Sequence, residues 1–219
     1  MGALIPLTDA SRRPVHVPVV TGCIILANFI AFGLELKGGE AFVLKWSVVP
    51  ANITAGHDWI TILTAMFLHA SWSHILGNMV FLWAFGPEVE DCMNPLRYLV
   101  FYLAGGLVAM LGQVAANPHS TVPCLGASGA IATLMGGFLV TYPGDQIKSI
   151  LIIFVFVRVS FIPAAVIIGV WFLTQLFNVG SIATAQTGGV AYVAHVAGAI
   201  FGALAVPLFR DPKYLADQA

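Results

Sequence analysis

The sequence predicts an all-α membrane protein built as a bundle of six transmembrane helices. Hydrophobic residues make up 59% of the chain and charged residues only 9%, and the mean hydropathy is +0.92. Ordinary soluble domains carry about 25% charged residues. The apolar residues gather in six runs, each close to the roughly 20 residues that a helix needs to cross a bilayer. Six such helices leave no room for a separate soluble domain in 219 residues.

The expected spans follow one another along most of the chain, at about 17–36, 62–86, 98–116, 126–142, 162–178 and 190–208. The first run is longer than the apolar core of a signal peptide and lacks a clear cleavage site, so we interpret it as a span. Residues 37–60 contain tryptophans among polar residues, which is typical of a loop in the membrane interface. The run 150–157 is too short to cross before Arg158. We expect it to be a buried or interfacial lead-in to the fifth span, which Pro163 can begin.

Basic residues predict the orientation, because cytoplasmic loops carry an excess of Lys and Arg. With the N-terminus inside, seven of the nine basic residues are cytoplasmic, and only Lys37 and Lys45 are external. We therefore expect cytoplasmic tails at 1–16 and 209–219 around a six-helix core at 17–208. The short tails and the lack of a transit-like leader favour a bacterial inner (plasma) membrane. The external loops would then be 37–60, 117–125 and 179–189.

Composition also excludes some partners and sites. A net charge of -1 and a pI near 6.6 give no basic stripe for nucleic acid. The three cysteines are far apart in sequence: Cys23 lies within the first expected span, Cys92 follows the second, and Cys124 precedes the fourth. They therefore indicate neither a disulfide framework nor a zinc site. We expect no metal and no cofactor.

Polar residues in the spans are the first candidates for function, because an unpaired polar group in hydrocarbon is costly. The first of three clusters contains His69, His74 and Asn78. His74 and Asn78 are four residues apart, so a helix presents both on one face. Their side-chain N–H groups can stabilise an oxyanion. The alternative is that they make interhelical hydrogen bonds that hold the bundle, and this cluster taken alone favours that structural role.

The second and third clusters contain a serine and a histidine. Gly126-Ala127-Ser128-Gly129-Ala130 begins the fourth span, where free N–H groups and the helix dipole favour an anion. Taken alone, this segment more often marks tight helix packing. A serine hydroxyl needs a neighbouring base, and His195 is the candidate. Gly198 and Gly202 lie on the same helical face as His195 and permit close approach to the fourth span. None of the ten acidic residues lies within the third to sixth spans, which favours a Ser-His dyad.

Together these segments resemble the rhomboid family of intramembrane serine proteases over about residues 17–208. The most specific motifs are His-x4-His-x3-Asn at 69, 74 and 78, Gly-x-Ser-Gly at 126–129 and Ala-His-x2-Gly-x3-Gly at 194–202. The resemblance implies that Ser128 is the nucleophile and that His195 is the general base and acid. It also implies that the oxyanion and substrate-binding region includes His74, Asn78, Gly126, Ala127 and the Ser128 backbone N–H.

Some residues depart from the family pattern. Trp46 is followed by Ser47 where the family commonly has a Trp-Arg pair, and Ala132 stands where some members have an aromatic ring that packs on the catalytic histidine. Another group must orient His195, and Tyr192 is the candidate. Glu90 matches a recurrent glutamate at the end of the family's second helix; we interpret this region as a solvated helix end in which Glu90 supports the structure. The other polar residues of the spans are expected to make interhelical hydrogen bonds: Asn28, Gln113, Gln175 and Asn178.

The expected function is cleavage of a peptide bond in or near a transmembrane helix of another protein, close to the external face. The expected partners are single-span or polytopic membrane proteins and the lipid bilayer. Two alternatives are a catalytically silent rhomboid-like binding protein and a small transporter or channel. The presence of both Ser128 and His195 disfavours the first. The sequence lacks internal repeats and ionisable residues along the midplane, which disfavours the second.

Overall fold

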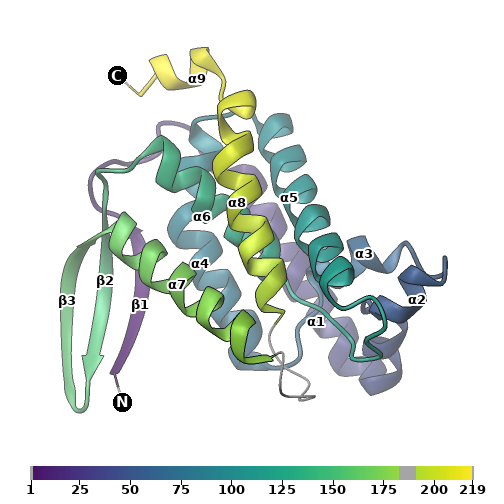
Figure 1. The fold of residues 1–219 in the computed structure, drawn as a ribbon. Helices are drawn as coiled ribbons and strands as arrows, with labels where there is room; N and C mark the ends of the chain where they lie inside the picture. The colour runs from purple at the N-terminus through teal and green to yellow at the C-terminus, as the bar shows by residue number, and fades with distance from the viewer. Residues whose placement is uncertain (1, 183–190, 219) are drawn as a thin grey trace.

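The protein is described by a computed structural model over residues 2–182 and 191–218. A bundle of helices is flanked by a three-stranded antiparallel sheet, drawn beside α7 in Figure 1. The long helices of the described chain are α1 (Val19–Trp46), α4 (Trp72–Asp91), α5 (Pro95–Ala116), α6 (Ser128–Thr141), α7 (Ala164–Ile182) and α8 (Tyr192–Phe209). Shorter segments are α2 (Pro50–Thr54), α3 (Thr61–Thr64), the 3-10 helix η1 (Ala65–Phe67) and α9 (Pro212–Ala216).

Local sequence signals explain where several helices begin and bend. The Ser71 side chain accepts a hydrogen bond from the His74 N–H at 3.2 Å and caps the start of α4. Asn94 caps α5 in the same way, and Pro95 takes the first helical position, where no N–H is needed. Gly39 has φ 64°, which interrupts α1 close to the point where the sequence predicts the end of the first span.

Helices α6 and α8 pack through the small-residue seam that the sequence predicts. A Cβ added at Gly198 or Gly202 would overlap the backbone carbonyl oxygen of Gly129 or Thr133 on α6. Thr133 Oγ1 also donates a hydrogen bond to the Gly198 carbonyl at 3.0 Å. Gly136 of α6 faces the backbone of α8 just as closely. The two helices therefore approach until their backbones touch, as small residues permit in membrane proteins.

The sheet corrects the prediction of an all-α protein. Its strands are β1 (Gly2–Asp9), β2 (Gln146–Ile153) and β3 (Phe156–Pro163), in the order β1-β2-β3. The run 150–157 is thus the turn end of a β-hairpin and not a lead-in to a helix, and the N-terminal segment expected as a tail contains β1. The run is rich in Ile, Val and Phe, which favour strands. Its apolar character alone did not distinguish a strand from a short helix.

The acidic end of α4 holds the segment that precedes α1. The Glu90 carboxylate accepts hydrogen bonds from the backbone N–H groups of Val20 and Thr21 at 2.8 and 2.7 Å, where α1 begins. Asp91 accepts one from the His16 N–H at 2.8 Å. Glu90 is only 5% exposed, so the expectation of a solvated helix end is wrong, whereas a supporting role for Glu90 agrees with these contacts. A carboxylate at a helix N-terminus also offsets the helix dipole.

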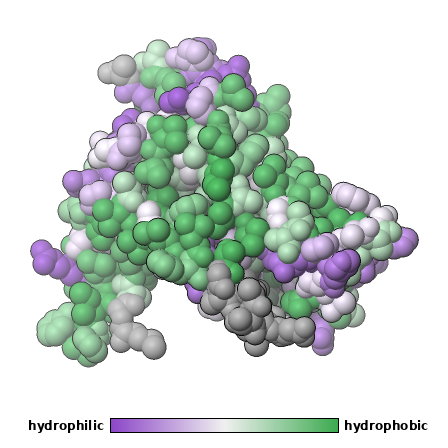
Figure 2. Space-filling view, viewed as in Figure 1, coloured by the Kyte–Doolittle hydropathy of each residue, from purple (hydrophilic) through white to green (hydrophobic). Residues whose placement is uncertain are grey.

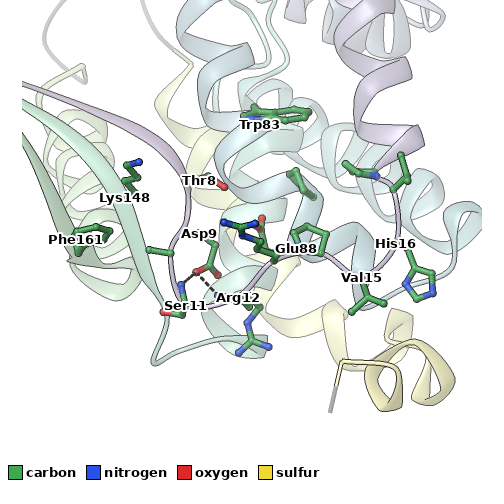
Figure 3. Close-up of a pocket in the computed structure, with 16 residues that line it drawn as sticks. Thr8, Asp9, Ser11, Arg12, Val15, His16, Trp83, Glu88, Lys148 and Phe161 are labelled. Atoms are coloured by element: carbon green, nitrogen blue, oxygen red, sulfur yellow. Dashed lines mark hydrogen bonds between the residues drawn. The ribbon is translucent and has the colours of Figure 1, made fainter.

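A cavity of about 840 Å³ lies between the N-terminal segment, the sheet and α4 (Figure 3). Asp9 and Arg12 line it, and the Arg12 guanidinium forms an ion pair with Asp145. Burial, together with the neighbouring Asp145 carboxyl, raises the pKa of Asp9 to about 6. Burial also acts to raise the pKa of Asp145, but the hydrogen bond from Arg12 holds it below its ordinary value.

Three helices of the described chain are long and apolar enough to cross a membrane: α1, α5 and α8. Two shorter apolar helices lie at Ser128–Thr141 and Ala164–Val179. Hydrophobic residues cover the middle of the visible face, and hydrophilic ones gather toward the C-terminal end and around the α2–α3 region (Figure 2). This distribution is that of an integral membrane protein. Three of the six expected crossings therefore meet the criteria of length and composition.

Candidate active site

Ser128 and His195 meet at the ends of two packed helices. Ser128 is the first residue of α6, and His195 lies in the first turn of α8. The distance from Ser128 Oγ to His195 Nε2 is 2.6 Å, which is that of a hydrogen bond. His195 is buried and Ser128 is half-buried. The seam between α6 and α8 is what brings the two side chains to the same end of the bundle.

The other ring nitrogen of His195 contacts Gln175, from α7. His195 Nδ1 lies 2.7 Å from Gln175 Oε1. The sequence predicts an interhelical hydrogen bond for Gln175, which is confirmed, but it does not indicate His195 as the partner. Tyr192, the candidate that the sequence offers for that role, instead forms an edge contact with the histidine ring at a centroid distance of 6.4 Å. The ring of Trp171, also from α7, lies 5.5 Å from the histidine ring.

His74 and Asn78 face the same cavity from the first two turns of α4. The cavity measures about 680 Å³ and is lined by residues of α4, α6, α7, α8 and the loop before α6, among them Ser128 and His195. Asn78 is 9% exposed, and its Nδ2 has no hydrogen-bond partner among residues 2–182 and 191–218. Such a buried, unpartnered donor is available to a ligand in the cavity.

Gly126 and Ala127 shape the start of α6 without lining this cavity. Gly126 has φ 128°, a backbone conformation that favours glycine, and its N–H donates to the Ala65 carbonyl at 2.8 Å. A Cβ on Gly126 would lie 3.0 Å from the His74 ring. Ala127 is fully buried at the N-cap position of α6. These residues therefore lie directly beside Ser128 and His74 but outside the lining of this cavity.

His69 stands behind the site and contacts Glu35, which the sequence motifs do not indicate. The backbone N–H of His69 donates to both carboxylate oxygens of Glu35, at 3.0 Å each, and Glu35 is a buried residue of α1. The His69 ring packs edge-on against the His74 ring at 5.0 Å, and its ring nitrogens have no hydrogen-bond partner within the described part of the chain. His69 thus supports His74 from outside the cavity.

The loop before α6 forms one wall of the cavity. Residues 122–125 line it, and Cys124 pairs with Val48 through a short antiparallel bridge. The expected external loop at 179–189 lies mostly outside the described residues. Across residues 2–182 and 191–218, no three His, Cys, Asp or Glu side chains cluster as metal ligands would.

The arrangement contains the parts needed for acyl transfer. A hydroxyl is hydrogen-bonded to an imidazole, the imidazole is held at its second nitrogen, and an amide donor lies in the same cavity. The first N–H groups of α6, which have no acceptor within the helix, begin at Ser128 itself.

Comparisons with known proteins agree with these features. A family model described as the Rhomboid domain matches residues 56–212. Rhomboid protease GluP of Bacillus subtilis (strain 168) is 32% identical over 119 residues, which is 53% of this chain and 23% of the relative. Rhomboid protein 1, mitochondrial, of Saccharomyces cerevisiae is 27% identical over 184 residues, 81% of this chain and 49% of the relative. Presenilin-associated rhomboid-like protein, mitochondrial, of Homo sapiens is 28% identical over 149 residues, 66% of this chain and 36% of the relative.

The chain spans less than half the length of each of these three relatives. The matched domain nevertheless covers most of this chain and includes all three polar clusters. This protein belongs to the rhomboid family.

Proposed function

We propose that this protein is an intramembrane serine endopeptidase that uses Ser128 as nucleophile and His195 as general base and acid. The observation that carries the proposal is the 2.6 Å contact between Ser128 Oγ and His195 Nε2, beside a cavity that both residues line. A serine hydroxyl is a weak nucleophile until a base removes its proton, and an imidazole at hydrogen-bond distance meets that need.

In the proposed reaction, Ser128 Oγ attacks the carbonyl carbon of the scissile peptide bond while its proton passes to His195 Nε2. The carbon–nitrogen bond then breaks, and the proton on Nε2 passes to the leaving amine. Water, deprotonated by the same nitrogen, hydrolyses the resulting acyl-enzyme and restores the serine.

The oxyanion formed in each step needs donors that are already in position. Asn78 Nδ2 is buried without a partner in the described chain, and the first N–H groups of α6 begin at Ser128. The positive end of the α6 dipole adds to this stabilisation. One such donor is worth about 2.7–4 kcal/mol in serine hydrolases. The His74 ring, beside Gly126, completes the same region of the proposed site.

The membrane geometry supports cleavage near a bilayer surface. In the proposed topology, α4, α6 and α7 join α1, α5 and α8 as the six crossings, with both termini cytoplasmic. Helix α6 has only 14 residues and is therefore about 21 Å long, which is shorter than a hydrocarbon core of about 30 Å. If its C-terminal end lies at the cytoplasmic boundary, Ser128 lies about 9 Å below the external one. Water then has a short route to the site.

The proposed substrates are single-span or polytopic membrane proteins, in a bacterial plasma membrane. A peptide bond within a helix is shielded by its side chains and its carbonyl is hydrogen-bonded. A substrate helix must therefore unwind before Ser128 can attack, so segments with small or helix-breaking residues near the external face are the expected targets.

Reconstitution in liposomes with a panel of single-span reporter proteins tests this proposal. The wild type should cleave at least one reporter, whereas Ser128→Ala and His195→Ala should lose cleavage to the background level. Ser160→Ala, in strand β3 and outside the cavity, is the matched control and should cleave normally. A folded wild type that cleaves no reporter and does not react with a fluorophosphonate would refute the proposal. Cleavage that survives Ser128→Ala would assign the nucleophile elsewhere.

A further inference from the structure

The contact between His195 and Gln175 has a chemical consequence beyond helix packing. We propose that Gln175 is a positioning residue that fixes His195 in the ring form needed to accept the Ser128 proton. This inference rests on the proposed function. His195 Nδ1 lies 2.7 Å from Gln175 Oε1, and the two residues are 6% and 7% exposed. At this burial, water competes little for either group.

The orientation of the Gln175 amide follows from its other contacts. Its Nε2 donates to the Trp171 carbonyl, one turn earlier on α7, at 3.2 Å and to Thr174 Oγ1 at 3.1 Å. A flipped amide would direct Oε1 at the Trp171 carbonyl, and two acceptors would then face each other. Oε1 therefore faces the histidine.

The amide orientation in turn selects one histidine tautomer. A carbonyl oxygen can only accept, so Nδ1 carries the hydrogen and donates it to Gln175. In a neutral imidazole, Nε2 is then the unprotonated nitrogen, and it accepts a hydrogen bond from the Ser128 hydroxyl at 2.6 Å. The other tautomer would direct an N–H at Ser128 and prevent His195 from acting as a base.

Other groups around the ring do not supply this restraint. Among the described residues, the hydrogen bonds to the His195 ring come from Ser128 and Gln175. Trp171 restrains the plane of the ring by a tilted contact at 5.5 Å, but a ring face cannot choose between tautomers. Tyr192 touches the ring edge-on. Helix α7 thus provides both the restraint on the ring plane and the restraint on its proton.

Three variants separate positioning from a merely structural contribution. Gln175→Met keeps the length of the side chain and removes the acceptor. Gln175→Glu, protonated in this buried site, keeps an acceptor oxygen facing Nδ1 and a donor facing the Trp171 carbonyl. The matched control is Gln113→Met, because Gln113 Oε1 accepts from the Ala194 N–H at 3.3 Å, next to His195 but not on its ring. If Gln175 contributed only to helix packing, Gln175→Glu would lower kcat at least as much as Gln175→Met, because burying a carboxyl group costs more than burying an apolar side chain.

The measurement is kcat and KM for a cleaved reporter in liposomes. We expect Gln175→Met to lower kcat by at least about tenfold with KM within about twofold. Gln175→Glu should retain most of kcat, and Gln113→Met should resemble the wild type. A wild-type kcat in Gln175→Met, or a kcat in Gln175→Glu as low as in Gln175→Met, would overturn the inference. If Ser128→Ala still abolished cleavage in the same assay, the proposed function would stand.

A second measurement does not depend on turnover. The ¹⁵N spectrum of histidine-labelled protein in liposomes, with His195 assigned by its loss in His195→Ala, should show Nδ1 protonated and Nε2 unprotonated in the wild type. Gln175→Met should give a mixture of tautomers. A wild-type His195 with its proton on Nε2 would contradict the inference even in a protein that cleaves nothing.

Discussion

Replacing Gly202 by alanine tests whether the α6–α8 seam holds the Ser128 and His195 side chains together. The added Cβ would overlap the Thr133 carbonyl oxygen, a backbone atom that cannot rotate away. Carbon and carbonyl oxygen atoms come no closer than about 3.3–3.6 Å in ordinary contacts. We therefore expect α8 to move away from α6 by on the order of 1 Å.

A displacement of that size has consequences for both stability and chemistry. The distance between Ser128 Oγ and His195 Nε2 would grow from 2.6 Å to about 3.6 Å, beyond hydrogen-bond range. Overpacking costs about 1–3 kcal/mol, and the better helix propensity of alanine recovers up to about 1 kcal/mol. We expect a lower Tm and at least about a tenfold slower reaction with a fluorophosphonate.

Thermal unfolding in detergent and the rate of fluorophosphonate labelling measure the two effects. Gly33→Ala is the control, because Gly33 is a helical glycine of α1 and a Cβ there would meet nothing within 4 Å. It should leave the labelling rate unchanged and leave Tm unchanged or slightly higher. If Gly202→Ala matched the wild type in both Tm and labelling rate, the reasoning about the seam would be refuted.

Further predictions concern single polar side chains. Asn78→Ala should lower kcat by about 100-fold, because it removes a donor from the proposed oxyanion site. Tm should change little, because Asn78 Nδ2 has no hydrogen-bond partner in the described chain. An unchanged kcat would show that Asn78 does not belong to the oxyanion site. Burial raises the pKa of Asp9 to about 6 from an ordinary 3.8, so folding is favoured while Asp9 is protonated, and this contribution is lost as the pH rises through 6. Asp9→Asn should therefore have a higher Tm than the wild type at pH 7–8 and a similar Tm at pH 4. Equal Tm values for the two proteins at pH 8 would contradict the raised pKa of Asp9. Glu90→Gln should lower Tm, since an amide has one acceptor oxygen for the two backbone donors at Val20 and Thr21; an unchanged Tm would show that this cap contributes nothing.

The parts of the structure that depend on short-range spacing could be predicted from the sequence. His74 and Asn78 share a helix face because they are four residues apart, and both line the cavity. Gly198 and Gly202 share a face for the same reason and form the seam with α6. Small residues at helical spacing thus indicate where two backbones meet.

The sheet depends on a pairing that no local pattern contains. Strand β1 pairs with β2 across about 140 residues, with Ile5 opposite Ile150. Periodicity within residues 150–157 cannot distinguish a strand from a short buried helix. The partner strand, which decides the matter, lies in a segment expected as a tail.

The partner of His195 likewise depends on a contact between distant segments. The sequence predicts Tyr192 as the orienting group, and for Gln175 it predicts only an interhelical hydrogen bond. Gln175 is 20 residues from His195 in sequence, and only the packing of α7 on α8 brings its Oε1 to the ring. The spacing of motifs can therefore indicate that Ser128 and His195 meet without indicating which residue holds the imidazole.

The proposed role of Ser128 as nucleophile is tested most directly by locating a covalent adduct. Wild-type protein in liposomes would be treated with a fluorophosphonate and digested, and the modified peptide sequenced by mass spectrometry. We expect a single modified serine, Ser128, and no adduct in the folded His195→Ala variant. An adduct on a different serine, or labelling of Ser128 that persists at the wild-type rate without His195, would contradict the proposed Ser128–His195 dyad.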